Sequence, residues 1–134
     1  MSLARNKSRV VAMTILYQVY LYKKNKIDYN IDDVIDEVND SDDLFVRSLV
    51  DGVIEYDEEL EKIANKYLNN WTINRLGFTD QAIIKIGIYE LLHTDTPFRV
   101  CIDEAIELAH EYSDDAVVKM INGVLDKVYH NECC

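Results

Sequence analysis

Apolar residues recur every three or four positions along almost the whole chain, and this spacing constrains the fold more than any other feature. A stripe of that period lies on one face of an α-helix, whereas a half-buried strand needs strict alternation of apolar and polar residues, which is nearly absent. The 134 residues include one proline and four glycines, so little would interrupt helices. We therefore expect an all-α protein that forms one domain over residues 1–134.

We expect about seven helices, and the apolar stripes with the polar breaks between them locate six of them. We expect the first over residues 3–24 and a short second helix after Asn30, whose side chain can cap it. A long helix is expected over residues 45–67, with Ser41 as a candidate cap before it. Gly52, inside that helix, marks a bend or a close helix crossing.

The stretch from residue 83 to residue 92 is apolar on most sides, which is typical of the central helix of a bundle. Thr79 is its expected cap, and Trp71 is the candidate buried anchor of the connector before it. Gly87 would let a neighbouring helix approach. Two more helices are expected, one after Pro97 and one near the C-terminus.

Charge is distributed unevenly along the chain. The formal net charge is −11, yet residues 1–27 contain six basic residues and no acidic one. A basic segment on an acidic body is typical of a contact with a polyanion. The same charges could instead be paired with neighbouring carboxylates, and composition does not separate these two interpretations.

Several short motifs resemble metal sites, but their geometry argues against that chemistry. Residues 32–36 have the acidic spacing of a magnesium-diphosphate site, and Glu90–His93 and Glu107–His110 have the Glu-x-x-His spacing of di-iron bundles. We expect Glu90 and Glu107 to point away from the apolar stripes, so these ligands cannot converge. The three cysteines form no disulfide framework and fit a reducing compartment. We expect no enzyme, no cofactor and no metal.

No apolar run approaches the ~20 residues that a membrane span requires, and no secretory signal is visible. We therefore expect a cytoplasmic protein that does not contact the membrane.

The last helix has one weak point, at Asn122 and Gly123. Glycine inside a helix costs roughly 1 kcal/mol relative to alanine. Helical geometry places Gly123 opposite the apolar stripe, so core packing does not explain it, whereas a bare helix surface would let a nucleotide or another backbone come close.

Four stretches, in the right order, resemble one family. They are SRVVAMTILYQVYL near the N-terminus and, in the second half, DQAIIKIGIYELL, PFRVCIDEAIELAHEYSDD and KMINGVLDK. Together they resemble the NusB family of bacterial transcription antitermination factors, over nearly the whole chain and least after Lys24. The resemblance implies an all-α fold of two small helical bundles packed together.

The resemblance also implies partners. Family members bind the boxA element of nascent ribosomal RNA as a single strand, together with NusE, a small-subunit ribosomal protein. They join other Nus factors on RNA polymerase and suppress premature termination, and they occur as monomers or homodimers. The same domain precedes certain ribosomal RNA cytosine methyltransferases, but we expect the free-standing protein because no room remains for the enzyme domain. A scaffold that docks NusE with little RNA binding of its own stays open as the alternative.

Single-stranded RNA is held by cations along its backbone and by aromatic rings under its bases. From the basic start of the chain and from the resemblance, the predicted RNA-binding residues are Arg5, Lys7, Arg9, Tyr17, Tyr67, Asp80, Lys85, Met120, Asn122 and Gly123. Asp80 matches an acidic position that can accept hydrogen bonds from base amino groups. Met120 stands where the family has phenylalanine, which removes a stacking ring and predicts greater dependence on NusE.

Overall fold

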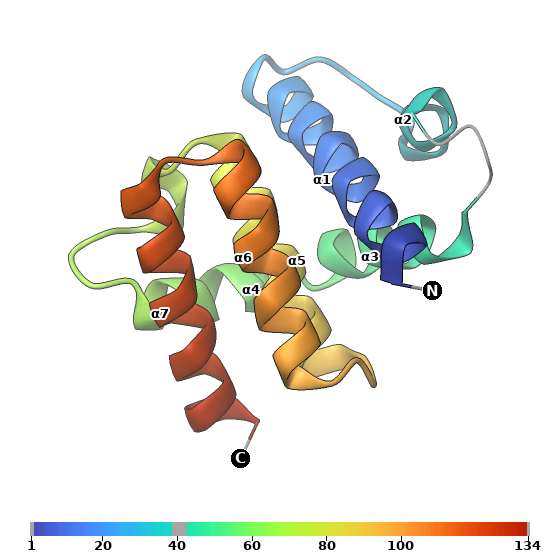
Figure 1. Cartoon of the computed structure of the whole chain (residues 1–134). Coiled ribbons are helices and arrows are strands. Elements are labelled where there is room, and N and C mark those ends of the chain that lie inside the picture. The colour runs from blue at the N-terminus through green and yellow to red at the C-terminus, as the bar shows by residue number, and fades with distance from the viewer. Residues whose placement is uncertain (1, 39–42, 134) are drawn as a thin grey trace.

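The computed structural model of the chain describes residues 2–38 and 43–133, and within them it contains helices and no strand (Figure 1). The all-α fold predicted from the apolar spacing is confirmed. The described elements are α1 (Ser2–Lys24), α2 (Ile31–Val38), α3 (Leu44–Glu55), α4 (Asp57–Tyr67), the 3₁₀ turn η1 (Ile73–Arg75), α5 (Phe78–His93), α6 (Phe98–Tyr112) and α7 (Asp115–Glu132). In this part of the chain, no helix has both the length and the apolar character to cross a membrane.

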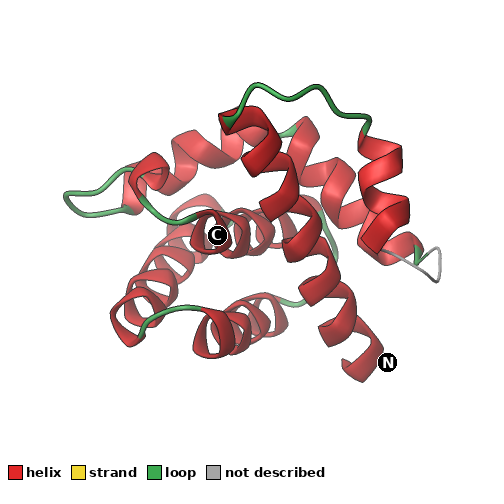
Figure 2. Cartoon of the chain, turned by 90° about the horizontal axis from the view of Figure 1, so that it is seen from above, coloured by secondary structure: helices red, strands yellow, loops and turns green. Residues whose placement is uncertain are grey.

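The helices form two bundles that share one helix. α1, α2 and α3 pack together on one side of the molecule, and α4, α6 and α7 lie on the other (Figure 1). α5 lies between them and contacts α1 and α3 as well as α4, α6 and α7. Figure 2 shows the same arrangement from above. The predicted pair of packed bundles is confirmed.

Burial on all sides distinguishes α5 from the other helices, because every residue from 81 to 88 is buried. Its sequence, apolar on most sides, predicts this central position. Gly87 lets α7 come close, since a Cβ added there would lie 3.0 Å from both Cδ atoms of Leu125 and 3.5 Å from Cβ of Ala105. The expected approach of a neighbouring helix at Gly87 is confirmed.

The crossing of α3 and α5 depends on a second glycine. Gly52 is buried in α3, and an added Cβ would lie 2.1 Å from Cζ of Tyr89 on α5. No real contact is that short, so the Tyr89 ring would have to move. The ring is held by stacking on Tyr56 and His93, at centroid distances of 6.2 and 5.6 Å. Of the two roles expected for Gly52, the structure shows the close crossing.

Two helix boundaries differ from those predicted. The stretch expected as one helix over residues 45–67 is two helices that meet at Tyr56, which has φ −100° and ψ 17°. Three acidic residues, 57–59, follow directly, and negative charge favours a new helix N-terminus there. α5 already begins at Phe78, so the prediction that Thr79 caps it is wrong.

The residues that cap α2 and α3 immediately precede these helices and bond to the backbone of their first turns. The side chain of Asn30 accepts a hydrogen bond from the backbone N–H of Asp33 at 3.1 Å, which confirms it as the cap of α2. Ser41, the candidate cap of the next helix, lies outside the described residues. α3 is capped by Asp43, whose carboxylate accepts a hydrogen bond from the N–H of Phe45 at 2.8 Å.

The connector between α4 and α5 is anchored by a different residue from the one expected. Trp71 is 47% exposed, so the prediction that its ring is a buried anchor is wrong. Ile73 is fully buried instead, and its backbone N–H donates to the side-chain oxygen of Asn65 on α4 at 2.7 Å. The isoleucine holds the connector to the core and leaves the indole ring at the surface.

The two glycines Gly52 and Gly123 should respond oppositely to alanine. Gly52→Ala overpacks the crossing with Tyr89 and should lower the free energy of unfolding by about 1–3 kcal/mol. Gly123→Ala meets no atom within 4 Å, so only helix propensity changes and stability should rise by up to about 1 kcal/mol. Urea unfolding followed by circular dichroism measures both, and a stabilising Gly52→Ala would contradict the crossing described here.

Candidate nucleic-acid interface

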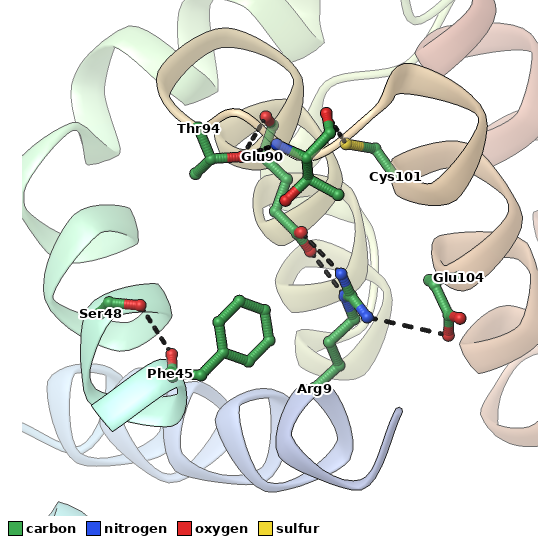
Figure 3. A network of polar contacts seen from close by, with 8 residues as sticks. Arg9, Phe45, Ser48, Glu90, Thr94, Cys101 and Glu104 are labelled. Atoms are coloured by element: carbon green, nitrogen blue, oxygen red, sulfur yellow. Dashed lines mark hydrogen bonds and ion pairs between the residues drawn. The ribbon is translucent and has the colours of Figure 1, made fainter. Parts of the chain in front are cut away.

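Arg9 of α1 is buried inside the protein rather than presented to a ligand (Figure 3). It is 3% exposed, and its Nε and Nη2 donate to the two carboxylate oxygens of Glu90 at 2.7 and 2.8 Å. Glu90 itself is 1% exposed, so the expectation that it points away from the core is wrong. The RNA contact of Arg9 stays a prediction that this geometry disfavours, because its bidentate fork is already occupied by a carboxylate of α5.

A second carboxylate faces the same guanidinium. Glu104 of α6 approaches Nη1 of Arg9 at 4.0 Å (Figure 3). Burial by itself lowers the pKa of Arg9, but the hydrogen bond and the charge of Glu90 outweigh burial, so the pKa is raised. Burial raises the pKa of the Glu104 carboxyl, whose buried Oε2 has no hydrogen-bond partner in the described part of the chain. Arg9 therefore remains charged and bound to its internal partners.

Lys85 of α5 is likewise paired inside the protein. Its side chain is 4% exposed, and Nζ lies 2.7 Å from a carboxylate oxygen of Asp57 at the start of α4. Nζ also lies 5.2 Å from the ring centroid of Tyr20. Reaching a phosphate would break this ion pair and leave Asp57 without its partner. The phosphate contact of Lys85 therefore stays a prediction that this ion pair disfavours.

Arg5 and Lys7 remain exposed at the start of α1. The guanidinium carbon of Arg5 lies 4.0 Å from the ring centroid of Phe45, so the ring orients this cation. Lys7 lines a groove of about 500 Å³ between α1 and α6, which also contains the carboxylates of Glu107 and Glu111. Acidic residues in the same groove reduce the positive potential that Lys7 can offer to RNA.

Tyr17 and Asp80 each make a contact at the first turn of α5. Tyr17 is 41% exposed and meets Phe78 edge-on, with ring centroids 6.0 Å apart and an interplanar angle of 79°. Asp80 is in the same turn as Phe78, and its carboxylate accepts a hydrogen bond from the hydroxyl of Ser113. The Tyr17 ring is therefore open to a ligand, whereas one carboxylate oxygen of Asp80 already accepts a hydrogen bond from Ser113 at the end of α6.

Three predicted residues come together in a groove of about 210 Å³ between the end of α4 and the middle of α7. These are Tyr67, Met120 and Gly123. Gly123 is exposed, and nothing in the described residues lies within 4 Å of where its Cβ would be. Asn122, beside it, is exposed on the same helix. The weak point in α7 thus opens onto a groove, and an internal close contact does not explain it.

The same groove contains two cations that the prediction missed. Lys119 and Lys127 line it, together with Asn69 and Val124. Both lysines lie on the same helix face as Met120 and Gly123, because positions 119, 120, 123 and 127 follow the three-to-four-residue period of a helix. The helical spacing of α7 was therefore a sufficient signal to find them. We name the surface lined by Tyr67, Asn69, Lys119, Met120, Gly123, Val124 and Lys127 the α4–α7 groove.

Tyr67 is fixed by a polar contact at the end of this groove. Its hydroxyl donates to a carboxylate oxygen of Glu132, which also accepts from Nζ of Lys66 at 3.0 Å. This hydrogen bond, aided by burial, raises the pKa of the Tyr67 hydroxyl above its ordinary value. The ring is half-buried and held in place, so Tyr67 borders the groove as a preorganised aromatic wall.

Among the described residues, no group of three or more histidine, cysteine, aspartate or glutamate side chains is arranged to hold a metal ion. The glutamate of the first Glu-x-x-His motif, Glu90, is paired with Arg9. Asp32 and Asp36 of the acidic motif pair with Arg47 at 2.8 and 3.5 Å on the surface. These carboxylates are therefore engaged by arginine rather than gathered as ligands.

Comparison with known proteins agrees with this fold. The sequence profile of the NusB family matches residues 6–130. The transcription antitermination protein NusB of Staphylococcus aureus (strain JH9) is 39% identical over 127 residues, which cover 94% of this chain and 98% of that protein. The structure of Thermotoga maritima NusB superposes with a TM-score of 0.82 at 28% identity, covering 95% of this chain and 91% of that one. A structure of NusB and NusE in complex with double-stranded RNA gives a TM-score of 0.80 at 27% identity, covering 97% and 98%.

Fold and site together define a class: an all-α binding protein of two bundles with open, partly aromatic grooves on its surface. Within that class the assignment is specific. The chain belongs to the NusB family, whose members are transcription antitermination proteins, that is, regulatory proteins and not enzymes.

The Arg9–Glu90 pair should dominate the stability contributed by the cations of α1. Arg9→Ala leaves Glu90 buried without its partner and should lower the free energy of unfolding by about 3–5 kcal/mol. Arg5→Ala removes an exposed contact with Phe45 and should cost only about 0.5–1 kcal/mol. Equilibrium urea denaturation compares the two variants with the parent protein. Equal, small decreases in stability would show that Arg9 is not the internal tie described here.

Proposed function

We propose that this chain acts as an antitermination factor that binds boxA-type single-stranded RNA of nascent ribosomal transcripts jointly with NusE. In this role it works in the cytoplasm with other Nus factors on RNA polymerase. The observation that carries the proposal is the α4–α7 groove, where a fixed ring, two lysines and a bare helix surface meet. The relative solved with NusE and double-stranded RNA supports NusE and RNA as partners, and the unpaired, boxA-type character of the RNA is part of the proposal.

The groove has the parts that an unpaired nucleotide needs. Single-stranded RNA offers phosphates to cations and unstacked bases to aromatic rings. Lys119 and Lys127 provide the cations, Tyr67 provides the ring, and Gly123 leaves room for the backbone to approach the helix. The amide of Asn69 can donate to or accept from a base edge. A double helix would not present its bases to such a ring, so we assign the groove to unpaired RNA.

The charge of the chain argues for binding with a partner. Its formal net charge is −11, and two predicted cations, Arg9 and Lys85, are neutralised internally. RNA approaching this surface is therefore repelled by most of the molecule and attracted over a small area. A basic partner such as a ribosomal protein would supply the missing positive charge, which is why we propose joint recognition with NusE.

A second candidate function is a scaffold that docks NusE and contributes little to RNA binding. The internal pairing of Arg9 and Lys85 favours it, because carboxylates occupy these two predicted RNA contacts and Lys7 shares its groove with two more. The two functions differ in whether residues of the α4–α7 groove change RNA affinity.

Titration of fluorescein-labelled boxA-type RNA, with and without NusE and over a series of salt concentrations, separates the two functions. The Lys119→Ala, Lys127→Ala double variant should bind RNA more weakly. The slope of the logarithm of its binding constant against the logarithm of the salt concentration should be shallower by about 0.7 for each phosphate that no longer contacts a lysine. The control is the Lys62→Ala, Arg99→Ala double variant, which removes the same charge from exposed positions outside the groove. Equal affinities for both double variants would support the scaffold instead.

Gly123 should be needed for RNA and not for folding. Gly123→Leu fills the surface of the α4–α7 groove with a side chain and should weaken RNA binding about tenfold or more, the scale of a single base stack. Because nothing in the described residues lies near that position, the melting temperature should stay the same or rise. RNA titration and thermal unfolding of one preparation measure both effects. Unchanged RNA affinity in a folded variant would remove Gly123 from the interface.

A further inference from the structure

The indole ring of Trp71 lies on the surface of a protein that has no other tryptophan. It is 47% exposed, although a ring of this size gains more than most side chains from burial. The neighbouring residues Asn69, Asn70 and Thr72 are all exposed and polar. The ring is therefore an isolated aromatic surface in a polar setting, and neither the core nor an apolar patch accounts for it.

Trp71 is presented by a backbone that is fixed on both sides. Asn70, just before it, has φ 62°, a left-handed conformation that asparagine tolerates and that turns the chain sharply. Ile73, two residues after it, is fully buried, and its backbone N–H donates to the side chain of Asn65. The side-chain amide of Asn74 donates to Glu61 at 3.0 Å. These contacts hold the connector to α4 and keep the ring at the surface.

A cation lies over this ring. The guanidinium carbon of Arg75, in η1, is 5.2 Å from the Trp71 ring centroid. Arg75 is exposed as well, so the pair forms an accessible platform of one aromatic ring and one planar cation. Bases of unpaired RNA stack both on aromatic rings and on guanidinium planes. We name Trp71 and Arg75 the Trp–Arg platform.

The platform lies next to the α4–α7 groove. Asn69 lines that groove, and two residues of chain span at most about 7 Å, so Trp71 is within one nucleotide of it. Figure 1 shows this connector at the edge of the molecule beside α7. An RNA strand held between Lys119 and Lys127 could therefore reach the platform without leaving the surface.

We propose that the Trp–Arg platform is a stacking site for one unpaired base next to the nucleotides in the α4–α7 groove. Trp71 provides the stacking face, and Arg75 holds the ring and offers a second plane. This inference rests on the proposed RNA binding and adds two residues to it. A protein contact is the less favoured occupant, because the residues around the ring are polar and an apolar partner would find no continuous patch.

Because Trp71 is the chain's one tryptophan, its fluorescence reports on this site alone. Addition of unlabelled boxA-type RNA, alone and with a tryptophan-free NusE, should quench the emission and protect it from acrylamide. Trp71→Ala should lower RNA affinity at least about fivefold, the lower end for removal of one base stack, whereas Trp71→Phe should retain most of it. Arg75→Ala should weaken binding more than Arg99→Ala, which removes an equal charge from the cation–ring pair with Phe98.

Each remaining outcome decides the matter. RNA that binds with full affinity while Trp71 stays unquenched overturns the platform and leaves the proposed RNA binding intact. Protection of the ring by NusE without RNA assigns Trp71 to a protein contact. No RNA binding in any arm overturns both proposals. The melting temperature of each variant is measured alongside. If Trp71→Ala fails to fold, the RNA affinities of Trp71→Phe and Arg75→Ala are compared with that of the parent protein.

Discussion

The burial of α5 on every side is the constraint on which the rest of the structure depends. A helix in that position carries its polar residues into the interior, where each must find a hydrogen-bond partner. Gln81 donates to the backbone oxygen of Leu76, and Lys85 pairs with Asp57. Glu90 accepts two hydrogen bonds from the guanidinium of Arg9. These three contacts tie the central helix to the connector before it, to α4 and to α1. The interior position of α5 thereby decides which charges reach the surface.

Most of the fold follows from features that act locally. Helix existence, the central place of α5 and the close approaches at Gly52 and Gly87 are encoded in spacing and glycine position, and all agree with the structure. The break at Tyr56 was missed because the apolar stripe runs through it, although the three acids that follow marked a helix start. Trp71 was misplaced because hydrophobicity alone does not tell which of two nearby residues, Trp71 or Ile73, reaches the core.

The candidate site was less predictable, because sequence charge does not show where a charge is paired. Arg9 and Lys85 read as cations available to RNA, yet their partners lie 81 and 28 residues away in the chain. Such contacts depend on tertiary packing and have no local signal. In contrast, Lys119 and Lys127 share one helix face with Met120 and Gly123, and the helical period alone would have located them. Charge on a single helix face is thus readable from sequence, whereas charge pairing between helices is not.

Internal pairing also determines how an acidic protein of this kind can hold RNA. Each cation paired in the interior is one phosphate contact fewer, so the internal pairing of Arg9 and Lys85 lowers the affinity owed to counterion release and its salt dependence. Aromatic stacking depends little on salt and does not require a basic surface. A chain with rings at Tyr17, Tyr67 and Trp71 and a net charge of −11 therefore suits a division of labour. In the function proposed here, the rings contact unpaired bases and a basic partner neutralises the phosphates.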